Sequence, residues 1–271
     1  MEETKKVWRN ALVILLVVLV VIVAGYFLFT KKKTSVQEVP VKSAEEAVLP
    51  ATEEKEEAHA PVSLAESDDY IRTIVREIST HPRLASWLKT KNIIRKFTAA
   101  VDNIASGQSP RRQIDFFSPR TPFSVIKRGE RLIIDPASYR RYDPVVDVFI
   151  SLDTKGCVSL FRSLKPLFQE AYRELGYPEA DFETTLIRAI LELLRTPIVE
   201  NEIVVEKGVV NYYMVDPVLE ELSEAQKHLL RMGPDNVAAI QMKLREIALA
   251  LDVPEYRLPQ PFHYRAKTSS N

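Results

Sequence analysis

The chain has 271 residues, and its 37 basic and 37 acidic side chains give a formal net charge of zero and an isoelectric point of about 6.9. This balance argues against a nucleic-acid-binding protein, which carries an excess of Lys and Arg. The single cysteine, Cys157, excludes an intramolecular disulfide and does not indicate a redox compartment.

An apolar, uncharged segment occupies residues 11–29, from Ala11 to Phe29. A helix over this segment is about 28 Å long, close to the ~30 Å hydrocarbon core of a bilayer. Bulky residues follow the only small pair, Ala24 and Gly25, so the segment lacks the site that signal-peptide cleavage needs. We therefore expect a retained transmembrane helix, preceded by an N-terminal tail at residues 1–10.

The charges that flank this segment do not decide its orientation. Lys5, Lys6 and Arg9 precede it, and lysines at 31–33 follow it, so the positive-inside rule gives a tie. Because the N-terminal tail is short, we expect the N-terminus in the cytoplasm and the body of the chain in the periplasm. In a bacterium, this arrangement predicts a protein of the inner membrane that crosses it once.

Residues 30–66 are predicted to form a disordered acidic linker. Between residues 34 and 66, three prolines and eight glutamates accompany only two lysines. Such a segment has little apolar surface to bury, so burial does not compensate the entropy lost on ordering. Fully extended, it reaches about 110 Å and would hold the following domain near the membrane.

The body of the chain, residues 67–253, is predicted to be one mainly α domain of the α+β class. Apolar residues recur at helical spacing in six segments: 70–78, 84–88, 93–104, 158–175, 182–194 and 237–251. Pro166 lies inside one of them, and we expect it to kink or split that helix. Residues 254–271 contain several prolines and polar residues, which predicts a flexible C-terminal tail.

Two β-hairpins are predicted within the helical domain. The first joins residues 123–126 to 132–134 around Gly129, and the second joins 203–205 to 209–213 around Gly208. We expect the two hairpins to pair into a small antiparallel sheet.

Short local signals predict where four helices begin. An Asp-Pro pair follows each hairpin, at Asp135 and Asp216, with the aspartate as cap and the proline in the first turn. Ser223 and Gln226 have the spacing of a capping box, and Pro234 opens the last helix. The repeated order of hairpin, Asp-Pro and helix fits an internal duplication, and it also fits turn chemistry alone.

Four separated blocks of sequence resemble a known family. They are FTAAVDN at 97–103, DPASYRRYDP at 135–144, LFQEAYRELGYP at 167–178 and LLRMGP at 229–234. The chain is similar, over roughly residues 66–252, to the bacterial domain-of-unknown-function family 3014. The resemblance implies a Gram-negative envelope protein with a membrane helix, a variable linker and a helical domain. It implies no reaction.

No catalytic or metal-ligating pattern stands out in the sequence. The scattered glycines form neither a P-loop nor a dinucleotide-binding turn, and the four histidines lack ligand spacing. Ser86 and Lys89 match the S-x-x-K motif of penicillin-binding proteins, but the companion motifs are missing. Asp135 and Asp143 precede prolines, which favours capping over acid–base chemistry. We therefore predict no catalytic residue, metal or cofactor.

The balanced net charge conceals an uneven distribution. Residues 68–142 carry fifteen basic and seven acidic side chains, whereas residues 143–256 carry eleven and twenty. The candidate binding residues lie in the basic half: Arg111, Arg112, Arg120, Tyr139, Arg140, Arg141 and Tyr142. Arginine suits bidentate contacts with carboxylate or phosphate, so this set predicts an anionic protein, cell-wall polymer or lipid surface as partner.

A competing interpretation assigns these charges no function. In it, the two halves neutralise each other across an internal seam, or the charges are scattered over solvated helix faces.

Taken together, these patterns predict a membrane-anchored binding or scaffold module of the envelope that does not bind nucleic acid. The alternative is an envelope hydrolase or transferase of unrecognised type. Self-association through the last helix is a weaker expectation, because no pattern indicates an oligomeric state.

Overall fold

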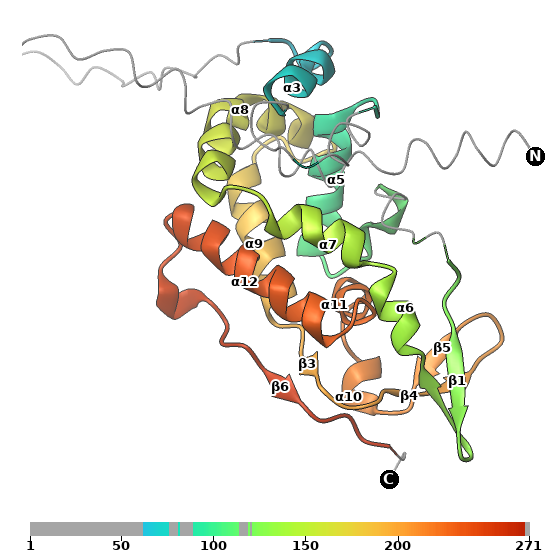
Figure 1. Ribbon diagram of the computed structural model, residues 1–271. Helices are drawn as coiled ribbons and strands as arrows, with labels where there is room; N and C mark the ends of the chain where they lie inside the picture. Colours follow the sequence, from blue (N-terminus) through green and yellow to red (C-terminus); the bar gives the residue numbers. More distant parts are fainter. Residues whose placement is uncertain (1–61, 76–80, 82–88, 114–118, 120, 269–271) are drawn as a thin grey trace, which may run out of the picture.

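The computed structural model describes residues 62–75, 81, 89–113, 119 and 121–268 (Figure 1). Its α-helices are α3 (Ser67–Val75), α5 (Ile93–Ala105), α6 (Pro136–Arg140), α7 (Asp143–Ile150), α8 (Thr154–Glu174), α9 (Phe182–Leu194), α10 (Pro217–Glu220), α11 (Glu224–Leu230) and α12 (Pro234–Ala250). Its strands are β1 (Val125–Arg128), β2 (Arg131–Ile134), β3 (Ile198–Val199), β4 (Val204–Lys207), β5 (Tyr212–Met214) and β6 (His263–Tyr264). Two 3-10 helices are η1 (Pro110–Arg112) and η3 (Glu255–Arg257). The domain is mainly helical with a small β part, as predicted.

The predicted transmembrane helix at 11–29 lies outside the described residues, as does most of the linker. Within the ranges just given, no helix combines the length and apolar character that crossing a membrane requires. The described core begins before the predicted boundary at residue 67, because Leu64 is already buried in it.

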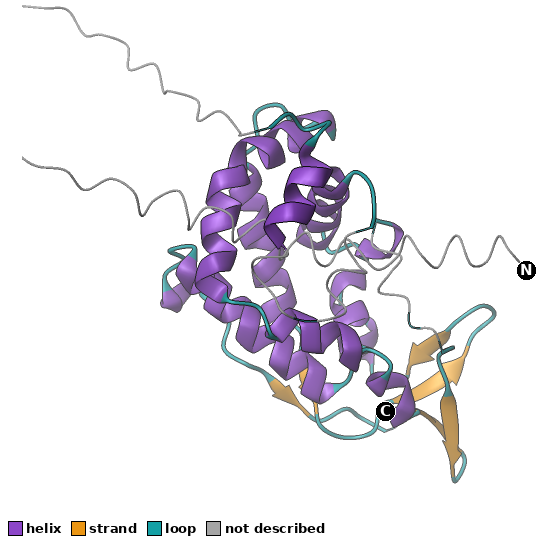
Figure 2. Ribbon diagram, turned by 45° about the horizontal axis from the view of Figure 1, so that its top comes forward, coloured by secondary structure: helices purple, strands orange, loops and turns teal. Residues whose placement is uncertain are grey.

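The helices pack around a cluster of aromatic rings. Helix α5 packs against α8 and α9, and α12 crosses α7, α8 and α9 (Figures 1 and 2). The ring of Phe168 lies edge-on to Phe97 at 5.1 Å and stacks on Phe182 at 5.3 Å, and all three side chains are buried. These contacts join α5, α8 and α9 through one core.

Helix α8 is not split at Pro166, which was one of the two outcomes predicted for this proline. The helix runs unbroken from Thr154 to Glu174 with the proline inside. Its buried face is almost continuous and includes Leu160, Leu164 and Phe168. Burial of this face compensates the backbone hydrogen bond that the proline cannot donate.

The two predicted hairpins do pair into one antiparallel sheet, with strand order β1-β2-β4-β5. Ile133 stands opposite Ile126 on one side and Val204 on the other. The sheet lies at one end of the helical part (Figure 2). In the second hairpin the returning strand starts only at Tyr212, later than predicted, and Val209 and Val210 are exposed in the turn.

The predicted helix starts are confirmed by their hydrogen bonds. The Asp135 carboxylate accepts from the Ala137 N–H, and the Asp216 carboxylate accepts from the Val218 N–H. The capping box of Ser223 is present, and α12 begins at Pro234.

The C-terminal segment differs from the predicted flexible tail over its described part, residues 254–268. Strand β6 pairs in parallel with β3, and Leu258 and Ala266 are buried. The side-chain amide of Asn201 both donates to the Ala266 carbonyl at 2.9 Å and accepts from the Ala266 N–H at 2.7 Å. These hydrogen bonds and the β3–β6 pairing hold the proline-rich segment against the domain.

Candidate functional site: a basic groove beside an apolar cavity

A groove of about 960 Å³ lies between the helical part and the sheet. Three elements bring basic side chains to it: η1, the end of α6 and the end of α11. The sheet contributes Tyr212 and Met214 from β5 to the same groove. The groove therefore forms where segments far apart in the sequence meet.

Four arginines line the groove: Arg111, Arg112, Arg141 and Arg231. Among the residues that the structure describes, no ion pair joins any of them to a carboxylate. Glu224 also lines the groove, but its carboxylate lies 2.8 Å from the Lys227 ammonium group. Among the described residues that line the groove, four arginines thus stand against one carboxylate, that of Glu224.

The guanidinium group of Arg141 is held in place by the protein. It donates to the carbonyl oxygens of Ser138 at 2.7 Å and Thr121 at 3.1 Å. It also lies 5.6 Å from the centre of the Phe123 ring and 5.1 Å from that of Tyr142. A positioned guanidinium loses little conformational entropy when an anion binds to its remaining N–H groups.

The imidazole of His228 also lines the groove. Its Nδ1 lies 3.2 Å from the Ser109 hydroxyl, and its ring is edge-on to that of Tyr142. Burial, and after it the positive charges of Arg231, Arg111 and Arg141, lower the pKa of His228 to about 4, against an opposite effect of Glu224. The imidazole is therefore neutral at pH 7.

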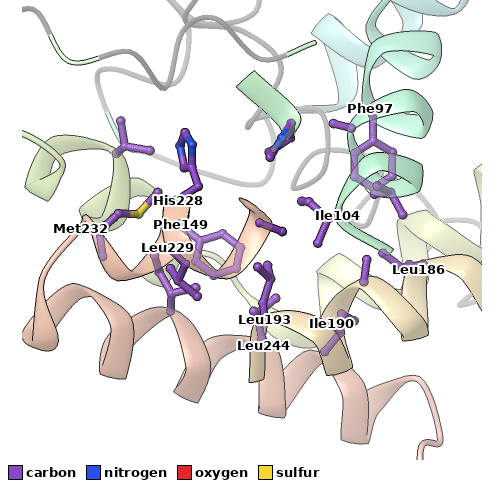
Figure 3. A pocket seen from close by; sticks show the side chains of 18 residues that line it. Phe97, Ile104, Phe149, Leu186, Ile190, Leu193, His228, Leu229, Met232 and Leu244 are labelled. Atoms are coloured by element: carbon purple, nitrogen blue, oxygen red, sulfur yellow. The ribbon is translucent and has the colours of Figure 1, made fainter. Parts of the chain in front are cut away.

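An apolar cavity of about 140 Å³ adjoins the groove inside the helical core. Every residue that lines it is apolar except His228, which lines both spaces. In Figure 3, Phe97 and Ile104 of α5 and Leu186 of α9 lie on one side, and Met232 lies on the other beside His228. His228 thus marks the boundary between a charged space and an apolar one.

The structure brings together part of the predicted candidate set. Arg111, Arg112 and Arg141 line one groove, and Tyr142 lines it with a largely buried ring. Arg140 is exposed and does not line the groove. The candidate Arg120 lies outside the described residues.

Tyr139 has a packing role that differs from the prediction. Its ring packs with the small core beneath the sheet and lies directly against the backbone at Gly233. Among the groove residues that the sequence analysis did not select are Arg231 and His228, and neither carried a local signal. Both belong to the acidic half of the sequence, more than eighty residues from Arg141, and only the fold places them beside it.

Two ion pairs do join the basic half of the sequence to the acidic half, as the competing interpretation of the charges predicts. Arg95 of the basic half pairs with Glu174 of the acidic half, with one N–O distance of 2.8 Å, and Arg128 pairs with Glu202. The groove arginines do not take part in this pairing among the described residues.

The carboxylates considered for acid–base chemistry have structural partners. Hydrogen bonds from the Ala137 N–H and the Ser124 hydroxyl lower the pKa of Asp135, as expected for a helix cap. Asp143 is the first residue of α7 rather than its cap, and its carboxylate accepts a hydrogen bond from the Asn236 amide at 2.9 Å. Ser86 lies outside the described residues.

A comparison with known protein families finds a match over most of the described helical domain. The model of the family described as Protein of unknown function (DUF3014) matches residues 93–248, more than half of the chain. The chain belongs to this family. No curated protein and no solved structure matches it. The DUF3014 match runs from the start of α5 nearly to the end of α12, so it includes every residue that lines the groove and the cavity.

Proposed function

We propose that this DUF3014 domain is a binding module whose groove takes an anionic group of a partner in the bacterial envelope. The observation that carries the proposal is the convergence of Arg111, Arg141 and Arg231 on one groove without carboxylate partners among the described residues. Like charges that share a groove repel one another, and a bound carboxylate or phosphate converts this repulsion into attraction.

The proposal also includes a membrane anchor and a linker that hold the domain at a membrane surface. The apolar segment at 11–29 is a single transmembrane anchor, and the acidic linker holds the domain near the periplasmic face of the inner membrane. Tethering raises the effective concentration of the domain toward partners at that surface. The apolar length of the segment and the acidic composition of the linker support this arrangement.

A capture experiment tests the binding role. The full-length protein is crosslinked in its own membranes, and the captured partners are compared with those of an R111Q/R112Q/R231Q variant. A matched variant, R131Q/R140Q, removes exposed arginines that do not line the groove. Loss of a partner in the first variant and retention in the second supports the proposal. An unchanged partner set in both overturns it.

A labelling experiment tests the orientation independently. Cys157 is fully buried, and burial raises the pKa of its thiol to about 12, so the native thiol reacts slowly in the folded domain. A cysteine introduced at the exposed Met242 (M242C) is expected to react with a membrane-impermeant maleimide in spheroplasts. A cysteine at Thr4 (T4C) is expected to react only after lysis. The reverse pattern contradicts a periplasmic domain.

The alternative, an envelope hydrolase, needs a nucleophile beside a general base, and the Ser109 hydroxyl lies 3.2 Å from His228. A general base works best when its pKa lies near the working pH. The pKa of about 4 makes His228 a weak base at neutral pH, so this contact does not support a nucleophilic serine.

A further inference from the structure

The groove and the cavity meet at one residue, and this juxtaposition restricts what the groove binds. His228 lines both spaces, and the charges of Arg111, Arg141 and Arg231 all act on its imidazole. A ligand at this boundary therefore has a negative charge and an apolar group close together.

From this geometry we infer that the site binds the C-terminal residue of a partner protein, with its α-carboxylate on the groove arginines and its apolar side chain in the cavity. The inference rests on the proposed function, because it assigns the anion that the groove takes. It names a substrate class that neither the arginines nor the cavity indicates alone.

The size of the cavity favours a side chain over a lipid chain. A dry apolar cavity of about 150 Å³ holds a benzene-sized group, and this cavity measures about 140 Å³. It therefore accommodates the side chain of Leu, Met or Phe but not an acyl chain of a membrane lipid. Ala225 and Ala189 in its wall leave this space open.

The size of the groove favours a peptide over a small free anion. At about 960 Å³ it is far larger than a carboxylate requires. Beyond the arginines, Asn211 and Tyr212 at the edge strand β5 also line it. On β5 the Met214 N–H already donates to the Glu220 carboxylate at 2.8 Å, so this strand offers side-chain surface rather than a free row of backbone groups. The residues that precede the C-terminus thus have a surface to follow.

Peptide binding to the full-length protein in zwitterionic nanodiscs tests the inference by titration calorimetry. The probe is acetyl-GSGSGL with a free C-terminal carboxylate, and empty nanodiscs provide the background. We expect replacement of the final Leu by Gly to weaken binding more than about tenfold, because a buried leucine side chain is lost. We expect C-terminal amidation to weaken it about tenfold, because the charge-assisted hydrogen bonds are lost.

Two variants separate the two parts of the site. Ala225→Leu fills the cavity and is expected to abolish the difference between Leu and Gly peptides while preserving the difference between acid and amide. Arg231→Gln is expected to do the opposite. Arg131→Gln, an exposed arginine outside the groove, is expected to change neither difference.

The outcomes distinguish this inference from the proposed function. If Leu and Gly peptides bind equally while the acid still binds better than the amide, the cavity takes no side chain and only the inference fails. If acid and amide bind equally, the groove does not recognise an α-carboxylate and the inference fails, whereas the proposed function fails only if the captured partner set is also unchanged in R111Q/R112Q/R231Q. If no peptide binds at millimolar concentration, the inference is overturned whatever small anions do. The peptide series on the unmodified protein decides these outcomes even if Ala225→Leu does not fold.

Discussion

At the scale of single residues, His228 connects the stability of the domain with its site. Its imidazole lies between three guanidinium groups and an apolar cavity, and both surroundings favour the neutral form. A histidine that is kept neutral in the folded state but not in the unfolded state makes folding sensitive to acid.

We predict that the His228→Gln variant loses less stability in acid than the unmodified protein. The pKa of His228 is lowered from 6.5 to about 4, so between these values the unfolded state binds more protons than the folded state. Stability from this group is complete above pH 6.5 and is lost as the pH falls toward 4, by about 3 kcal/mol in total. Urea unfolding between pH 4.5 and 7.5 measures the difference. Parallel pH profiles for the two proteins would show that His228 does not titrate in this way.

Gly233 gives a second prediction at this scale. Its φ of +88° is a conformation that other residues rarely adopt, and an added Cβ would lie 2.6 Å from the Cγ atom of Tyr139. We expect Gly233→Ala to lower the free energy of unfolding by at least ~2 kcal/mol, because strain and a steric clash add. Gly129→Ala is the matched control, with a φ of +61° and no atom within 4 Å of the added Cβ. Equal losses in both variants, measured by denaturant unfolding, would show that the contact with Tyr139 does not matter.

At the scale of elements, sequence rules worked where the structure is local. The caps at Asp135, Asp216 and Ser223 and both hairpins depend on neighbours a few residues away, so they could be predicted. The pairing of β3 with β6 joins residues 65 positions apart through two-residue strands, as in Ile198 with His263, and no periodicity marks it.

Helix α8 shows where a local rule is outweighed by packing. We predict that Pro166→Ala stabilises the domain by about 1–3 kcal/mol, because the backbone N–H that is restored can bond the carbonyl of Arg162. Thermal unfolding measures the change. Glu170→Ala, at an exposed position of the same helix, is the control and is expected to have little effect. A lower melting temperature for Pro166→Ala would mean that the ring of the proline packs better than alanine does.

At the scale of the whole molecule, the charge distribution of the sequence located only part of the groove. The basic half of the sequence does supply Arg111, Arg112 and Arg141 to one groove, but the acidic half supplies Arg231 and His228. Sequence could not predict this combination, because it arises where α11 meets the end of α6. The apolar cavity was equally hidden, since its lining residues look like any helical core.

The anchor, the orientation of the domain and self-association through the last helix stay predictions. They concern either residues outside the described part of the chain or partners that only an experiment supplies.

The most direct test of the anion site is the pKa of His228, measured by NMR on the full-length protein with and without inorganic phosphate. A phosphate among the arginines opposes their effect on the imidazole, so we predict that the pKa rises above about 4, while burial, the larger cause, still holds it below 6.5. Sodium chloride at equal ionic strength controls for screening. A pKa that moves no further in phosphate than in chloride would show that no anion binds beside His228, and it would contradict the central claim.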